Sequence, residues 1–277
     1  MGLDTIGKNL AGSREESHRV TARRAFYLDD AAAAAAAEIN RKLSDGEEAV
    51  DCLARCRAPE GLTLSERACF ALRLGRHLAL PIARVLQLHS GGMRITYVRQ
   101  GLCDAAYTAL TERLPSPTVR YSDTTAEAVD AVASGNFDFC ILPYADGEGN
   151  IVRSVRRLRE LAGLRVVSLA EIERPDGTPL TYALCGRDFL MPSGERLLLE
   201  LRLPSIAPES LKLLLELLSG ASSALLSLES ERDGGRVRVS LSLSRGMLVP
   251  FLIAFLNLIP SAEIDTLVRL RTPPTGA

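Results

Sequence analysis

The sequence predicts a multidomain protein in which a helical segment, an α/β segment and an α+β segment follow one another. The first observation is the length, because 277 residues exceed the roughly 100–200 residues of a typical domain. The second is that no convincing strand pattern precedes His89. The third is a change after residue 190 from alternating strands and helices to the order βαββαβ. We therefore expect domains at 1–90, 94–190 and 195–272.

In the first segment, the alanine run 31–37 follows Asp29 and Asp30 and predicts a helix, because alanine has the highest helix propensity. A turn and cap at 61–66 predict a further helix that carries Phe70 and Leu74 on one face. The stretch Ser90-Gly91-Gly92 marks a linker before the second segment.

The second segment alternates short apolar runs with helical patterns, which indicates a mostly parallel sheet covered by helices. Strands are expected at 94–98, 119–122, 137–144 and 164–169, and helices at 103–114, 124–134 and 151–161. The last helix carries four arginines at 153, 156, 157 and 159. This basic face could bind an anion, but we expect it to lie in solvent.

The third segment predicts a ferredoxin-like βαββαβ domain. Strands are expected at 197–203, 224–231, 236–244 and 263–271, and helices at 208–218 and 247–259. Asp233-Gly234-Gly235 between the second and third strands is a strong hairpin signal.

Composition limits the function. Hydrophobic residues at 47% and charged residues at 24% are typical of a folded globular protein, and a formal charge of −1 gives no basic field for nucleic acid or anionic lipid. The apolar stretch 247–259 is too short to span a bilayer.

Cys52 and Cys56 lack a second ligand pair at zinc spacing, so no metal site is expected. We expect a cytoplasmic protein with reduced thiols, no cofactor, and no nucleic-acid or membrane partner.

The third segment resembles an ACT domain, the ferredoxin-like module that binds amino-acid effectors. The stretch Leu228-Glu229-Ser230-Glu231-Arg232 is similar to the I-E-S-R-P stretch that ends the second strand of ACT domains attached to prephenate dehydratases. The resemblance implies that Glu229, Ser230 and Arg232 bind an effector such as phenylalanine. It also implies a homodimer, because ACT-like modules commonly pair side by side.

The second segment resembles the first lobe of a prephenate dehydratase, a periplasmic-binding-like α/β unit. The similarity lies in the glycine-bearing turn of 97–106, in 122–132, and in the run from Pro143 to Val152. It implies conversion of prephenate to phenylpyruvate, water and CO2, as a lyase of phenylalanine biosynthesis. Thr181 is then the expected proton donor, and the residues implied to contact substrate are Asp146, Gly147, Gly149 and Asn150.

Two departures leave other functions open. Ala145-Asp146-Gly147 stands where the family has E-N-S, and the first-lobe pattern runs almost directly into the third segment, without length for a second lobe to close a water-poor cleft. One alternative is a non-catalytic regulatory or partner protein that keeps the ACT-like module. Another is a chorismate mutase in the helical segment, as in bifunctional mutase–dehydratases, with Arg41, Lys42 and Gln87 binding chorismate.

Overall fold

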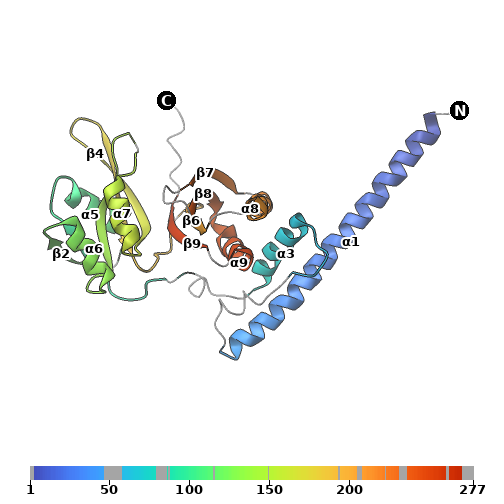
Figure 1. The fold of residues 1–277 in the computed structure, drawn as a ribbon, viewed down its shortest axis with the longest axis horizontal. Coiled ribbons are helices and arrows are strands. Elements are labelled where there is room, and N and C mark those ends of the chain that lie inside the picture. Colours follow the sequence, from blue (N-terminus) through green and yellow to red (C-terminus); the bar gives the residue numbers. More distant parts are fainter. Residues whose placement is uncertain are drawn as a thin grey trace. The chain divides into compact units, whose positions relative to one another are not determined.

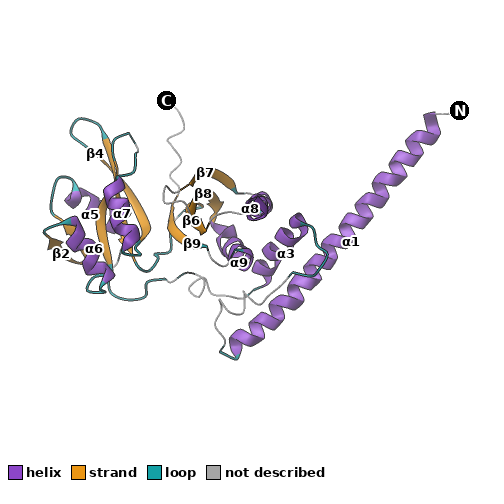
Figure 2. Ribbon diagram, viewed as in Figure 1, coloured by secondary structure: helices purple, strands orange, loops and turns teal. Residues whose placement is uncertain are grey.

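The computed structural model describes residues 3–46, 58–78, 86, 88–114, 116–148, 150–192, 194–204, 208–221, 223–230, 236–259 and 262–269, and for residues 3–23, 204, 208–210 and 257 the backbone alone. The chain divides into two compact units. One unit comprises 82–206, 222–246 and 261–277 and holds all the described strands. The other comprises 1–81, 207–221 and 247–260, and its described elements are helices joined by turns (Figure 2).

The sheet unit begins with an α/β lobe (Figure 1). Its elements in chain order are β1 (Arg94–Val98), α5 (Cys103–Thr111), β2 (Thr118–Ser122), α6 (Thr125–Ala133), β3 (Phe139–Ala145), α7 (Arg153–Leu161), β4 (Arg165–Glu173) and β5 (Pro179–Gly186). β1 lies between β2 and β3 and is parallel to both. The crossover from β1 to β2 and the crossover from β2 to β3 run in opposite directions across the sheet, so right-handed connections place α5 and α6 on opposite faces.

β5 lies between β3 and β4 and is antiparallel to both. The chain passes from β4 to β5 through the tight turn 174–178, in which Gly177 has a φ of 81°. Glycine suits this position because residues with a Cβ rarely adopt a positive φ. The lobe is therefore a mixed sheet, whereas its strand alternation predicted mostly parallel pairing.

Four further strands follow the lobe: β6 (Arg196–Pro204), β7 (Ala224–Ser230), β8 (Arg236–Ser244) and β9 (Glu263–Arg269). They pair antiparallel in the order β9-β6-β8-β7. With the helices that connect them along the chain, this confirms the predicted βαββαβ order.

β9 joins the two groups of strands, because it pairs parallel to β4 at Val166 and Thr266. The described strands thus form one mixed sheet of nine strands in the order β2-β1-β3-β5-β4-β9-β6-β8-β7. The apolar core beneath α6 continues across this junction, since Val132 and Cys140 of the lobe belong to one cluster with Val268 of β9. The lobe and the C-terminal strands thus share a core.

The helical unit contains α1 (Leu3–Ser44), α3 (Leu64–His77), α8 (Pro208–Gly220) and α9 (Leu248–Leu258). α1 buries a stripe of side chains three or four residues apart, namely Leu28, Ala32, Ala36, Ile39 and Leu43. A capping box begins α3, because Thr63 and Glu66 accept each other's backbone N–H. The helices predicted from the alanine run and from the cap at 61–66 are confirmed.

α3 and α9 approach closely at Gly75. A Cβ at this position would lie 2.7 Å from the carbonyl oxygen and 2.8 Å from the Cα of Pro250. The absence of a side chain at Gly75 is what allows the two backbones to pack at this distance.

Candidate functional site

Three predicted site residues of the lobe lie close together. Thr181 of β5 pairs with Ala145 of β3, which directly precedes Asp146. A Cβ on Gly147 would overlap the side chain of Thr178, so this turn also packs against the turn between β4 and β5. Thr181, Asp146 and Gly147 therefore meet at one end of the sheet, while Gly149 lies outside the described residues.

The polar groups of the 146–150 turn bind one another. Asp146 Oδ1 accepts the backbone N–H of Glu148 at 3.0 Å and of Asn150 at 2.9 Å. The Asn150 N–H is the main reason that the pKa of Asp146 lies below its usual range. The Asn150 amide in turn donates to Glu148 at 3.2 Å. This carboxylate closes its own turn, as aspartate does in Asx turns.

Thr181 faces no second lobe within the described residues. Between 94 and 186, the longest connection between consecutive elements is 146–152, and β4 returns to β5 through 174–178. Thr181 itself is half-buried. General acid catalysis by a hydroxyl gains most in a closed, water-poor site, and this part of the chain does not build one.

A polar cluster that sequence reasoning missed lies at the carboxyl ends of β1 and β2, the edge where open α/β sheets bind ligands. The Tyr97 hydroxyl donates to Asp104 Oδ1 at 2.6 Å, and Arg99 Nε donates to Asp104 Oδ2 at 3.3 Å. The Arg99 guanidinium lies 5.0 Å from the ring centre of Tyr121. The available signal was the glycine-bearing turn after β1, which carries Arg99 and leads to Asp104 in the first turn of α5.

Burial and hydrogen bonds together set the protonation of this cluster. Burial, and then the bond to Asp104, raise the pKa of Tyr97, so Tyr97 stays a neutral donor. The same bond lowers the pKa of Asp104. Burial raises the pKa of the nearby Cys103 thiol, which disfavours the nucleophilic thiolate. The cluster is therefore suited to binding rather than to nucleophilic catalysis.

Of the predicted effector residues, Glu229 and Ser230 lie exposed at the end of β7, and Arg232 lies outside the described residues. β7 is an edge strand of the described sheet. Glu229 is opposite Arg238 of β8 in the strand register. The predicted effector strand is therefore adjacent to a buried arginine.

The residues expected for a mutase are not brought together among the described residues. Arg41 pairs with Glu38 at 2.8 Å and with Asp45 at 3.2 Å on its own helix, and Lys42 lies 3.5 Å from Glu38. Gln87, Cys52 and Cys56 lie outside the described residues. The described part of the chain holds no group of three or more side chains that could bind a metal ion.

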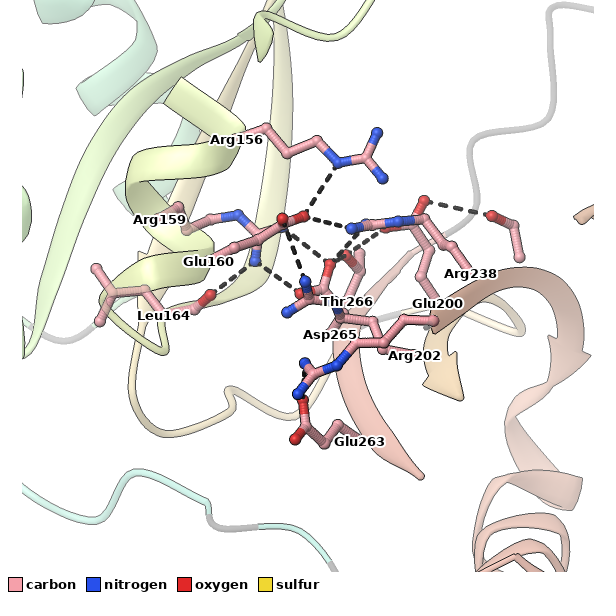
Figure 3. Close-up of polar contacts among 12 residues, drawn as sticks. Arg156, Arg159, Glu160, Leu164, Glu200, Arg202, Arg238, Glu263, Asp265 and Thr266 are labelled. Atoms are coloured by element: carbon pink, nitrogen blue, oxygen red, sulfur yellow. Dashed lines mark hydrogen bonds and ion pairs between the residues drawn. The ribbon is translucent and has the colours of Figure 1, made fainter. Parts of the chain in front are cut away.

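A buried ionic cluster joins α7 of the lobe to β9 (Figure 3). Arg159 has 1% of its surface exposed and donates from Nη1 to Asp265 Oδ1 at 3.1 Å and from Nη2 to Asp265 Oδ2 at 2.9 Å. Nη1 also donates to the Leu164 carbonyl at 2.6 Å. The expectation that the basic face of this helix lies in solvent is wrong for Arg159, because this side chain is buried against Asp265. The sequence gives no sign of this pairing, since the two residues are 106 positions apart.

Arg238 of β8, with 2% of its surface exposed, is the second buried cation. Its Nη1 donates to Asp265 Oδ2 at 2.8 Å, and its Nη2 forms a very short contact with Glu160 of α7. Glu160 also accepts from Arg156 Nε at 3.0 Å and from Arg202 Nη2 at 3.3 Å. Two carboxylates, one on each side of the junction, are thus each shared by several guanidinium groups (Figure 3).

Burial alone would raise the pKa of Asp265, but Arg159 and Arg238 outweigh it and lower the pKa below its usual range. Asp265 is therefore ionised at neutral pH. Among the described residues, Nε of Arg159 is buried without a hydrogen-bond partner. Removing either member of the buried Arg159–Asp265 pair leaves an uncompensated charge, which is strongly destabilising.

No protein-family model matches the chain, and no curated protein matches it. Similar solved structures include a prephenate dehydratase from Streptococcus mutans, with 16% identity and a TM-score of 0.46 over 64% of this chain and 97% of that chain. A prephenate dehydratase from Arthrobacter aurescens in complex with L-Phe has 13% identity and a TM-score of 0.47 over 64% and 90%. GqqA, described as a novel type of quorum-quenching acylase, has 17% identity and a TM-score of 0.45 over 65% and 97%. At these identities and TM-scores, the likeness transfers no activity to this chain.

Among the described residues, no helix is both long and apolar enough to cross a membrane.

Proposed function

We propose that this chain is a prephenate-dehydratase-like protein of phenylalanine biosynthesis that no longer performs the dehydratase reaction. In this proposal the C-terminal βαββαβ segment is an ACT-like module that binds an amino-acid effector, and the chain acts as a regulatory or partner protein. The domain ranges 1–90, 94–190 and 195–272 are part of the same proposal.

The observation that carries the loss of catalysis is the short turn 174–178 between β4 and β5. This turn leaves Thr181 at the open end of a single lobe. Asp146, which stands in the family's E-N-S segment, accepts the N–H groups of its own turn. The described lobe therefore offers a substrate with two carboxylates neither a second wall to enclose it nor an amide-rich cleft to bind it.

Effector binding is supported by the position of Glu229. This carboxylate is exposed at the end of an edge strand, where it can reach the ammonium group of an amino acid. Its register partner Arg238 contacts Asp265 and Glu160 at the junction with the lobe. Binding at Glu229 would therefore act on β7, which pairs with β8, the strand that carries Arg238.

A homodimer is supported by three exposed leucines of β7. Leu225, Leu226 and Leu228 have 39%, 49% and 47% of their surface exposed. An exposed edge strand with apolar side chains offers both unpaired backbone groups and hydrophobic area to a second chain.

The test is an ultraviolet absorbance assay of the purified chain with prephenate and with chorismate. We expect no phenylpyruvate formation and no loss of chorismate. Phenylpyruvate formation that is lost in Thr181→Ala and kept in the neighbouring Thr178→Ala would overturn the proposal. Loss of chorismate that is abolished in Arg41→Ala would instead support the mutase alternative.

A further inference from the structure

A polar cavity of about 390 Å³ lies beside the ionic cluster, at the junction of the lobe and the C-terminal strands. It belongs entirely to the sheet unit. Its walls come from the end of α7, the start of β4, and strands β6, β8 and β9: Glu160, Leu161, Gly163, Leu164, Arg165, Arg202, Arg236, Glu263, Ile264 and Asp265. This volume is within the range of about 300–1,000 Å³ that is usual for small-molecule sites.

Three guanidinium groups line the cavity, those of Arg165, Arg202 and Arg236. Of the lining carboxylates, Glu160 also binds Arg156 and Arg238, and Asp265 also binds Arg159 and Arg238. Glu263 lies 3.5 Å from Arg236 with 61% of its side chain exposed. The acidic groups of the wall are thus neutralised largely by arginines outside the cavity.

The charges of the surrounding cluster do not balance among the described residues. The cations are Arg156, Arg159, Arg165, Arg202, Arg236 and Arg238, and the anions are Glu160, Asp188, Glu200, Glu263 and Asp265. These described groups therefore carry a formal excess of one positive charge. Each guanidinium has five N–H donors, so an arginine that already binds carboxylates of the protein can still donate to a ligand.

The end of α7 does not oppose an anion. A helix C-terminus normally presents carbonyl groups and a partial negative charge. Here the carbonyls of Leu158, Arg159 and Glu160 accept the N–H groups of Ala162, Leu164 and Gly163, respectively. The Leu164 carbonyl is taken by Arg159. The electrostatic character of the cavity wall therefore depends mainly on the arginine side chains and not on the end of α7.

Arg165 packs against an aromatic ring in the cavity wall. Its guanidinium lies 4.9 Å from the ring centre of Phe189, which holds it in place. Burial lowers its pKa, so the carboxylates around it do not fully offset its desolvation. A bound anion would add to the stabilisation that these carboxylates give the charged guanidinium.

The rim of the cavity is apolar on one side. Leu161 has 80% of its surface exposed, which is the largest exposure among the described large hydrophobic residues. Ile264 lies in the same wall. These side chains can contact the apolar part of an organic molecule while its acidic group meets the arginines.

We propose that this cavity binds a small organic anion, a carboxylate or a phosphate ester, between the end of α7 and strands β6, β8 and β9. Arg165, Arg202 and Arg236 hold its acidic group, and Leu161 contacts its apolar body. The inference does not depend on the proposed function, because the cavity includes none of Thr181, Asp146 and Glu229.

The experiment is a calorimetric titration of the full chain with phenylacetate and with inorganic phosphate, at constant ionic strength. Choline serves as the cationic control. The key variant is Arg236→Gln, which removes an exposed wall arginine and leaves the buried pairs of Arg159 and Arg238 intact. Arg120→Gln makes the same charge change on an exposed position of β2, outside the cavity.

We expect saturable binding of at least one anion, weakened by about 10-fold or more in Arg236→Gln, since a charge-assisted hydrogen bond is lost. Arg120→Gln and wild type should bind alike, and choline should not bind. Binding of phenylacetate alone assigns a carboxylate ligand, and binding of phosphate alone assigns a phosphate ligand. The inference would be overturned if neither anion bound saturably. It would also be overturned if Arg236→Gln and Arg120→Gln weakened anion binding equally.

Discussion

Arg159 and Asp265 form a bidentate pair across the junction between helix α7 and strand β9, with N–O distances of 3.1 and 2.9 Å. The two residues are 106 positions apart in the sequence, and both are almost completely buried. Together with the pairing of β4 and β9, this contact makes the lobe and the C-terminal strands parts of one sheet unit. The pair therefore connects α7 of the lobe directly to the C-terminal strands.

Asp265→Asn should lower the free energy of unfolding by about 3–5 kcal/mol, because it leaves Arg159 and Arg238 buried without their shared anion. Urea denaturation followed by circular dichroism measures this loss. Glu263→Gln is the matched control, since Glu263 is on the same strand but 61% exposed, and we expect little change there. If the two substitutions lowered the free energy of unfolding equally, the buried contacts of Asp265 would not be an important source of stability.

Stability should fall in acid through Asp265. Its pKa is lowered in the folded state, so the stabilisation is fully present above its unfolded pKa of about 3.9 and is lost as the pH falls through the lower folded value. Urea midpoints measured between about pH 6 and pH 2.5 test this. We expect the difference between wild type and Asp265→Asn to narrow towards low pH. A constant difference over that range would contradict the prediction.

Gly75→Ala should destabilise the helical unit by about 1–3 kcal/mol, because the new methyl group meets the backbone of Pro250. Gly220→Ala is the comparison within the same unit. A Cβ there meets only the terminal Cδ1 of Leu72, at 2.7 Å, and this flexible side chain can move. Thermal unfolding should therefore show a larger drop in Tm for Gly75→Ala. The reverse order would mean that α3 and α9 do not pack closely at Gly75.

The purified chain should be a dimer by light scattering at micromolar concentration. Leu226→Lys should shift it to a monomer, because it places a charge on the exposed face of the edge strand β7. Met191→Lys introduces the same charge at a residue with 40% exposure outside β7, and should leave the dimer intact. A monomeric wild type would rule out the predicted assembly.

Much of the secondary structure could be predicted because it depends on local pattern. The apolar alternation of 236–244 and the capping residues at Thr63 are signals contained in a few neighbouring residues, and both gave the observed elements. The order βαββαβ followed from the same local rules.

The junction could not be predicted, because it depends on contacts between distant residues. Arg159 is one of four arginines in a short helix, and nothing in 153–161 distinguishes it from the three others. Its burial follows from Asp265 and from the pairing of Val166 with Thr266, which only the folded chain brings together. The cluster of Tyr97 and Asp104 was missed for a related reason, since the turn between them decides whether they meet.

The measurement that tests the proposed regulatory function most directly is calorimetric titration of the full chain with L-phenylalanine. We predict saturable binding by wild type and its loss in Glu229→Ala, because Glu229 is the predicted partner of the ammonium group. Absence of binding by wild type, or unchanged binding in Glu229→Ala, would contradict the proposal.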